Sequence, residues 1–257
     1  MCRKTILEEN KEYWTGRASG YSEVNRAELS TGQRQKWKDC LREELKRQFP
    51  NRPTEELIVL EVGTGPGFFA ILLRELGCSV TAVDLTPAML LEAKENAGAI
   101  AGEIRFMEMN AEELRFEDRS FDAVISRNLT WNLPHPAKAY AEWARVLKPG
   151  GILLNFDANW YTYLFDETAQ KAFDRDRINS AEQGVPDQNI GENFDVMENI
   201  ARRIPLSSLN RPDWDLRQLS ALGLNCEADE QIWQRVWSAE EKLNFASTPL
   251  FLIRATY

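Results

Sequence analysis

The residues with the clearest chemical potential surround a glycine-rich turn near position 65. The aliphatic run 57–62 predicts a buried strand, and Gly63-Thr64-Gly65-Pro66-Gly67 follows it directly. In open α/β sheets, ligands bind beyond the carboxyl ends of the strands, where glycines let the backbone approach a ligand closely. These glycines are spaced G-x-G-x-G, and Phe68 stands where the dinucleotide fingerprint has its last glycine. The turn therefore predicts a ligand site and argues against NAD.

Two acidic residues beside this turn indicate the charge of the ligand. Glu61 lies inside the strand, two residues before the turn. A carboxylate there would repel a pyrophosphate, but it would attract an ammonium or sulfonium by about 4 kcal/mol gross at about 4 Å and an effective dielectric near 20. Asp84 ends the next predicted strand, where a carboxylate can accept hydrogen bonds from both ribose hydroxyls. The pair predicts a nucleoside with a cationic appendage.

Alternating strands and helices must position these residues. Short aliphatic strands that alternate with helices predict a parallel sheet that is covered on both faces, with right-handed crossovers. Thr86 and Pro87 predict the N-cap and first residue of one of the helices. Two late runs predict further strands that form an antiparallel edge. The expected strands are 57–62, 80–83, 104–107, 121–126, 152–156, 227–237 and 249–257, and the expected helices include 68–76, the segment from Pro87, and 137–147.

The strand–helix alternation defines a core at 57–157 and leaves three other segments. Residues 1–56 are expected to form a helical N-terminal extension, in which 22–49 forms one long or two shorter helices before Pro50 and Pro53 end them. Residues 158–212 are polar and helical in tendency, and we expect them to form a lid or insertion. Residues 213–257 complete the core sheet.

Composition excludes several classes of protein. The 257 residues carry 31 Lys and Arg against 40 Asp and Glu, a net charge of −9, which disfavours binding to nucleic acid or to an anionic membrane. The four cysteines have neither zinc-ligand nor disulfide-framework spacing, so we expect free thiols, no metal site and a cytoplasmic location. The N-terminal residues reach charges too soon for a signal peptide, and no apolar run is long enough to span a membrane.

Five segments in order resemble the class I S-adenosylmethionine-dependent methyltransferases of the broad small-molecule group. They cover about residues 57–157, and their order and spacing carry the resemblance more strongly than any one segment. The resemblance implies a three-layer α/β fold with a seven-stranded, mostly parallel sheet whose last strand is antiparallel, and it places 249–257 between the fifth and sixth strands. The segments are Glu61–Gly67, Val83-Asp84, Asn110-Ala111-Glu112, Ser120–Val124 and Val146–Gly151.

The same resemblance implies which residues hold S-adenosylmethionine. Glu61 and the glycine turn, with Thr64, would meet the methionine part, and Asp84 would bind the ribose. Leu85 and Met89 would contact the adenine, and the 110–112 segment would meet its edge, although the family usually has Asp at position 110. A looser match at Tyr13-Trp14 and 17–21 suggests that Tyr21 contacts the carboxylate. The implied cofactor residues are Tyr21, Glu61, Gly63, Thr64, Gly65, Gly67, Asp84, Leu85, Met89, Asn110, Ala111, Glu112 and Arg127, the last through its backbone.

Candidates for catalysis and acceptor binding carry weaker signals. Asp157 and His135 are the only general bases that we name; His135, between two prolines at a helix entry, is better explained as a structural or solvated residue, and for Asp157 the two interpretations are balanced. The aromatic residues Trp131, Trp160 and Tyr161 are candidates for acceptor binding, against the commoner role of packing a lid.

The sequence thus favours an enzyme that methylates nitrogen or oxygen of a small molecule by in-line transfer. Such transfer depends mainly on alignment and proximity, because the donor is already activated. Two alternatives stay open: a non-catalytic S-adenosylmethionine-binding regulatory or partner protein, and an NAD-dependent dehydrogenase. A homodimer is also left open.

Overall fold

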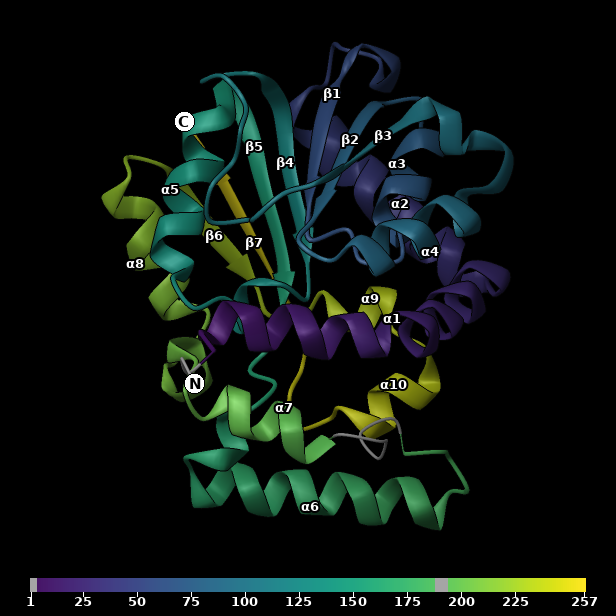
Figure 1. The fold of residues 1–257 in the computed structure, drawn as a ribbon, viewed down its shortest axis with the longest axis vertical. Helices are drawn as coiled ribbons and strands as arrows, with labels where there is room; N and C mark the ends of the chain where they lie inside the picture. Colours follow the sequence, from purple (N-terminus) through teal and green to yellow (C-terminus); the bar gives the residue numbers. More distant parts are fainter. Residues whose placement is uncertain (1–3, 188–193) are drawn as a thin grey trace.

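One seven-stranded sheet organises the protein in the computed structural model, which describes residues 4–187 and 194–257. The strand order is β3-β2-β1-β4-β5-β7-β6 (Figure 1). Strands β1 to β5 are parallel, and β7 runs antiparallel to both of its neighbours, β5 and β6. The strands are β1 (Ile58–Val62), β2 (Ser79–Asp84), β3 (Ile104–Glu108), β4 (Phe121–Arg127), β5 (Leu147–Asp157), β6 (Asn225–Asp229) and β7 (Phe251–Thr256).

This sheet confirms the predicted fold class and the insertion of 249–257 between the fifth and sixth strands. The prediction of a strand at 227–237 is wrong in its second half: β6 ends at Asp229, and Trp233–Val236 is the short helix α9. Ile232 and Val236 are both fully buried four residues apart, which is the spacing of one helix face and not of a strand. Strand β5 also begins five residues earlier than predicted, at Leu147.

Helices cover both faces of the sheet and bury two hydrophobic cores. On one face, α2 (Gly32–Gln48), α3 (Phe68–Glu75) and α9 pack on side chains such as Val59 and Ile125. On the other face, α5 (Pro136–Val146) and α8 (Asp213–Ala221) pack on Leu60 and Val124. Adjacent residues of β1 and of β4 thus point to opposite cores, as a sheet covered on both faces requires. Helix α4 (Pro87–Ala97) follows β2 and begins at Pro87 as predicted, although its N-cap Thr86 makes no side-chain capping bond.

The N-terminal region forms two helices, α1 (Ile6–Ser30) and α2, separated at Thr31. Trp37 of α2 is fully buried, with its ring edge-on to Phe68, Phe69 and Phe156. Helix α2 therefore shares the core of the sheet. Helix α1 instead crosses the carboxyl ends of the strands, below the tips of β4 and β5 in Figure 1. The segment boundaries predicted from the sequence stay a prediction.

A layer of shorter elements lies beyond α1, at the bottom of Figure 1. It contains α6 (Glu167–Glu182), α7 (Phe194–Ala201) and α10 (Ala239–Asn244). Met197 and Ile200 of α7 join Trp131 in a small buried cluster against which Tyr13 and Trp14 of α1 pack. Helix α1 therefore supplies one of the contacts that hold this layer to the rest of the fold.

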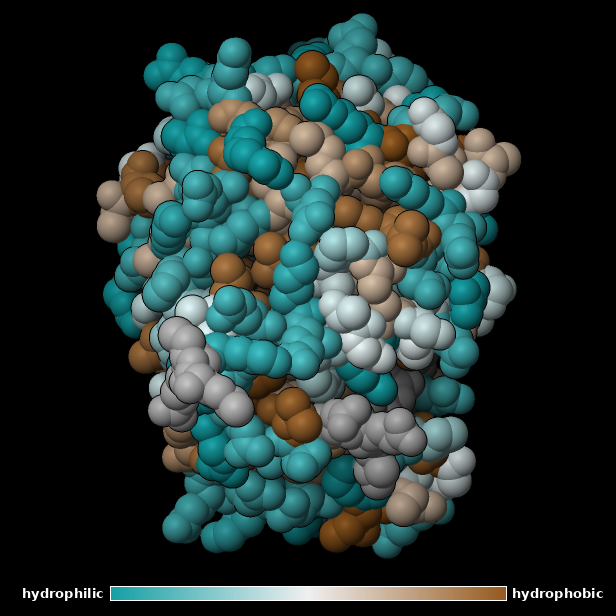
Figure 2. All heavy atoms as spheres, in the orientation of Figure 1, coloured by the Kyte–Doolittle hydropathy of each residue, from teal (hydrophilic) through white to brown (hydrophobic). Residues whose placement is uncertain are grey.

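The described surface is mostly polar. Figure 2 shows one face on which hydrophilic side chains dominate and hydrophobic atoms form small, separate patches. None of the helices in the described parts of the chain is long and apolar enough to cross a membrane. Cys40, Cys78 and Cys226 are free thiols, and Cys2 lies outside the described residues.

A buried network of charged residues fixes the end of β5. Asp157 and Arg211 are both fully enclosed and pair at 2.8 Å, and the same guanidinium also binds Asp215. Asp157 additionally accepts hydrogen bonds from the Thr130 hydroxyl and, at 2.9 Å, from the Trp131 backbone N–H. The carboxylate of Asp157 therefore ties the turn after β4 to α8, and it is committed to structural contacts.

We expect Trp37→Ala to lower the free energy of unfolding by about 3–5 kcal/mol, because it empties a large volume in the core that α2 shares with the sheet. Urea denaturation measures this change. Lys46→Ala, at an exposed position of the same helix, is the control and should stay within about 0.5 kcal/mol of the wild type. A small effect at Trp37 would contradict the shared core.

We expect Asp157→Ala to lower the unfolding free energy by about 3 kcal/mol, because Arg211 would keep a buried charge with only one of its two partners. The same denaturation experiment tests it, with exposed Asp174→Ala as the control. If the Asp157 variant were as stable as the control, the structural role of this carboxylate would be excluded.

Candidate functional site

The glycine-rich turn is held at the carboxyl end of β1 by the neighbouring strand. The backbone N–H groups of Gly63 and Thr64 donate to the carbonyl of Val83, at 2.8 and 3.0 Å. Gly65 donates its N–H to Asp84 Oδ2 at 2.9 Å and has a φ of +51°. Only glycine adopts this conformation readily, and a Cβ at position 65 would face the Tyr21 ring at 3.7 Å. The turn is thus fixed with its bare backbone toward an open space.

That space is a cavity that we call the glycine-loop cavity. It measures about 950 Å³, solvent at its mouth included, and it lies between the glycine turn, the ends of β2 and β4, and helix α1. Most of the cofactor residues predicted from the sequence line it. The predicted residues on its wall are Tyr21, Glu61, Gly63, Thr64, Gly65, Asp84, Leu85, Met89, Asn110, Ala111 and Arg127.

Two acidic side chains, Glu61 and Asp84, line this cavity. Glu61 is 3 % exposed and accepts a hydrogen bond from the Thr64 hydroxyl at 2.6 Å, and burial raises its pKa to about 8. Burial also raises the pKa of Asp84, although the N–H groups of Thr86 and Gly65 partly counter this. Neither carboxylate forms an ion pair with a described residue. The basic residues of the wall are engaged elsewhere: Lys11 with Glu108, and Arg127 with Glu28. The cavity therefore favours a cationic group near the turn.

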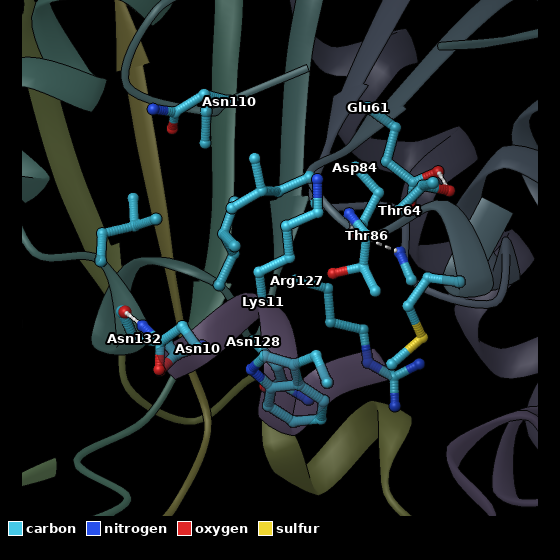
Figure 3. Close-up of a pocket in the computed structure, with 18 of the residues that line it drawn as sticks. Asn10, Lys11, Glu61, Thr64, Asp84, Thr86, Asn110, Arg127, Asn128 and Asn132 are labelled. Atoms are coloured by element: carbon cyan, nitrogen blue, oxygen red, sulfur yellow. Dashed lines mark hydrogen bonds between the residues drawn. The ribbon is translucent and has the colours of Figure 1, made fainter. Parts of the chain in front are cut away.

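The opposite end of the cavity is lined by amides. Asn10 donates to the backbone carbonyl of Asn132 at 2.8 Å, and Figure 3 shows this pair across the cavity from Glu61 and Thr64. The side-chain oxygens of Asn10 and Asn132 are buried without a partner among the described residues. The Asn110 oxygen accepts from the Glu112 N–H at 3.0 Å, so only its second lone pair faces outward. This end can therefore accept hydrogen bonds from an amino group.

The structure places four of the site residues predicted from the sequence outside the walls of the two cavities described in this section. Gly67 is the N-cap of α3 and faces Ala93 of α4. It therefore does not line the cavity. Glu112 is buried with its carboxylate on the His135 N–H, which turns it away from the ligand space. His135 itself is exposed at the start of α5 and lines neither cavity described here. Asp157 is enclosed in the network with Arg211. Neither proposed general base lines either cavity.

The side chain of Arg127 makes contacts that the sequence did not predict. Its guanidinium pairs with Glu28 of α1, at 2.5 Å for the shorter contact, and lies over the rings of Trp37 and Phe68 at 4.8 and 4.7 Å from their centres. Only 14 % of the Arg127 side chain and 7 % of that of Glu28 are exposed. This ion pair joins α1 to the end of β4 directly beside the glycine-loop cavity.

A second cavity is lined by both residues of this pair, and we call it the aromatic cavity. It measures about 940 Å³, and nine of its sixteen lining residues are aromatic. The two cavities share part of their walls, contributed by α1 and by the end of β4. The shared residues are Trp14, Tyr21, Asn25, Arg127 and Asn128, and the other aromatic residues are Trp131, Trp160, Tyr161, Tyr163, Phe194, Trp237 and Phe245.

The aromatic cavity therefore contains the three acceptor candidates from the sequence, Trp131, Trp160 and Tyr161. Sequence reasoning missed most of the α1 residues and Asn128. The rule that ligands meet the carboxyl ends of parallel strands could have found Asn128, which directly follows β4. No local signal marks Asn10 or Asn25, because they meet the cavity only once α1 crosses the strand ends.

The middle of the chain matches a known family. Residues 60–155 match a family model described as a methyltransferase domain. A demethylmenaquinone methyltransferase of Deinococcus radiodurans is 38% identical over 150 residues, which are 57% of this chain and 59% of that protein. The chain spans about half the length of the curated relatives it matches.

Solved structures share the fold at lower identity. A Haloferax volcanii protein solved in complex with the Trm112 methyltransferase activator has a TM-score of 0.57 and 17% identity, over 94% of this chain and 96% of that one. Geranyl diphosphate C-methyltransferase of Streptomyces coelicolor, solved with Mg²⁺, geranyl diphosphate and S-adenosylhomocysteine, has a TM-score of 0.54 and 16% identity, over 85% and 79%. With the strand order, the glycine turn and the family match in agreement, residues 60–155 belong to the class I S-adenosylmethionine-dependent methyltransferases.

Proposed function

We propose that this protein transfers a methyl group from S-adenosylmethionine to a nitrogen or oxygen atom of a small-molecule acceptor. The observation that carries the proposal is a pair of cavities with a common wall. One holds unpaired carboxylates beside a glycine turn, and the other is lined by aromatic rings. Because the two cavities share lining residues, a donor in one and an acceptor in the other would be neighbours, as a direct transfer requires.

The residues of the glycine-loop cavity fit S-adenosylmethionine. Glu61 would face the cationic methionine end, and Asp84 would accept from the ribose hydroxyls. Each oxygen of Asp84 accepts one backbone N–H, which leaves a lone pair on each for the sugar. The buried, unpartnered oxygens of Asn10 and Asn132 would accept from the amino group of the adenine. The bound cofactor supplies a methyl group on a sulfonium, already activated toward nucleophiles.

The chain itself must then orient the acceptor and exclude water. The aromatic rings supply a low-dielectric pocket, and the Arg127–Glu28 pair closes the space between α1 and β4. A desolvated nucleophile held near the methyl group reacts faster than one in water. Trp131, Trp160 and Tyr161 would contact the acceptor.

Carbon methylation is the second candidate. The Deinococcus relative is named for demethylmenaquinone, and the Streptomyces neighbour for C-methylation of geranyl diphosphate. The aromatic cavity also suits a flat ring. A carbon acceptor, however, needs a base, and Asp157 and His135 lie outside both cavities. Locating the new methyl group in the product separates the two candidates.

Two further alternatives are less well supported. A regulatory protein that only binds the cofactor would not need a large aromatic cavity beside it. A dehydrogenase would place the pyrophosphate of NAD against Glu61 and Asp84, which disfavour it. The homodimer and the cytoplasmic location stay predictions.

We expect Asp84→Ala to weaken S-adenosylmethionine binding by about 10-fold or more, because the ribose loses a charge-assisted acceptor and Gly65 and Thr86 lose a partner. Isothermal titration calorimetry measures the change. Asp118→Ala, at a carboxylate that is 71 % exposed, is the matched control and should bind as the wild type does. Equal affinity in the Asp84 variant would remove the ribose assignment.

Binding should also depend on pH through Glu61. Since burial raises the pKa of Glu61 to about 8, this group is largely protonated in the free protein at neutral pH, and a bound cation favours its ionised form. We expect affinity to rise between about pH 6 and about pH 7.5, below the range where the α-amino group of the cofactor loses its own charge. In Glu61→Gln the rise should disappear. Calorimetry at several pH values tests this, and the same pH slope in both proteins would refute it.

The same shift has a consequence for the free protein. The folded state holds the Glu61 proton more tightly than the unfolded state does, so this contribution to stability is complete below about pH 4.5 and is lost as the pH rises through about 8.

A further inference from the structure

Asn128 stands at the boundary between the two cavities. It directly follows β4, lines both cavities and has a φ of +55°, a conformation that asparagine tolerates better than most residues. Its backbone N–H donates to Phe156 at 2.8 Å, and its carbonyl accepts from the indole N–H of Trp131 at 3.0 Å. The backbone at this position is thus held from two sides.

The side-chain amide of Asn128 has an oxygen that the fold leaves unused. Burial raises the pKa of the Tyr21 hydroxyl, and the Asn128 side chain partly counters this rise. The amide oxygen is buried and has no partner among the described residues. It is therefore free to accept a hydrogen bond from a ligand at the wall between donor and acceptor.

The charges of the aromatic cavity restrict what the ligand is. Arg127 is the only basic residue on the described wall, and Glu28 already neutralises it. Glu241 accepts from the Ser238 N–H at 2.7 Å and from the side chain of Gln33. No cation is left to hold a phosphate or diphosphate, and each carboxylate of the wall is engaged. The ligand body is accordingly uncharged and flat enough for the rings.

An amide oxygen can accept a hydrogen bond but cannot take up a proton at neutral pH. A phenol or a ring carbon needs deprotonation before it attacks, whereas an uncharged amine does not. An amine N–H can donate to Asn128 while the nitrogen lone pair points elsewhere. The wall therefore suits nitrogen better than oxygen or carbon.

We propose that Asn128 orients the nucleophilic nitrogen of an uncharged aromatic or heteroaromatic amine bound in the aromatic cavity. The inference rests on the proposed methyl transfer and specifies its acceptor. The nitrogen lone pair forms the new N–CH₃ bond while the S–CH₃ bond breaks, and sulfur keeps the electron pair as the neutral thioether. The proton that the nitrogen then carries in excess leaves to water.

The first experiment compares three acceptors with one ring system: naphthylamine, naphthol and naphthohydroquinone. The full chain receives each with isotopically labelled S-adenosylmethionine, and NMR locates the methyl group in the product. We expect N-methylation of the amine at the highest kcat/KM. Exclusive O- or C-methylation, or no transfer to the amine although calorimetry shows the cofactor bound, overturns the inference. Failure of the cofactor to bind would instead overturn the proposed function.

The second experiment tests Asn128 with two variants that tolerate its backbone conformation. Asn128→Gly removes the amide, and Asn128→Asp keeps an acceptor oxygen at the same place. We expect kcat/KM for the amine to fall about 10-fold or more in the glycine variant and to recover at least in part in the aspartate variant. Equal kcat/KM in the glycine variant and the wild type overturns the role of Asn128.

A binding measurement separates ligand contact from a structural role. Calorimetry on the S-adenosylhomocysteine complex compares naphthylamine with naphthalene, which has no N–H. The glycine variant should lose affinity for the amine by about 5-fold or more while its affinity for the hydrocarbon and for S-adenosylhomocysteine stays unchanged. Equal losses for amine and hydrocarbon contradict the proposal.

Discussion

The buried ion pair between Arg127 and Glu28 is the interaction on which both cavities depend. It joins the C-terminal end of helix α1 to the end of β4, and the guanidinium also lies over aromatic rings of the core. A buried ion pair is costly to desolvate, so it is weak evidence for stability by itself. Its effect here is geometric, since it fixes the helix at one height above the strand ends. Trp14 and Tyr21 of α1 can line both cavities only because the helix is held there.

The same pair leaves the charge of the site to the two carboxylates near the glycine turn. Arg127 is a basic residue of this cavity, but its guanidinium is paired with Glu28. Glu61 and Asp84 thus have no cationic partner among the described residues, and burial raises the pKa of both. The Asp157–Arg211–Asp215 network shows the opposite arrangement, because both of its carboxylates pair with one guanidinium and hold chain segments together. The acidic residues of the candidate site thus lack a cationic partner, whereas those of the structural network have one.

Sequence predicted the parts of the molecule that local pattern determines. The glycine turn, the strand before it and Asp84 after the next strand lie within 30 residues of one another, so spacing and charge placed them together. Asp157 could not be judged in this way, because Arg211, which occupies its carboxylate, lies 54 residues later. Asn10 and Asn25 could not be predicted as cavity residues, because they line the cavity only through the position of α1 across the strand ends. Glu112 and Gly67 lie in segments that reach the cavity. The Glu112 carboxylate binds the His135 N–H instead, and Gly67 packs on Ala93.

The position of β7 has a consequence for how the chain reaches this state. Residues 251–256 lie between β5 and β6, so neither of those strands has its partner on that side until the late segment arrives. During synthesis, the five parallel strands and the glycine turn leave the ribosome about a hundred residues earlier. A nascent chain therefore exposes the unpaired backbone of β5, which is a template for pairing with other chains. Insertion of β7 pairs the exposed edge of β5. Strand β7 therefore also protects the chain from pairing with other chains.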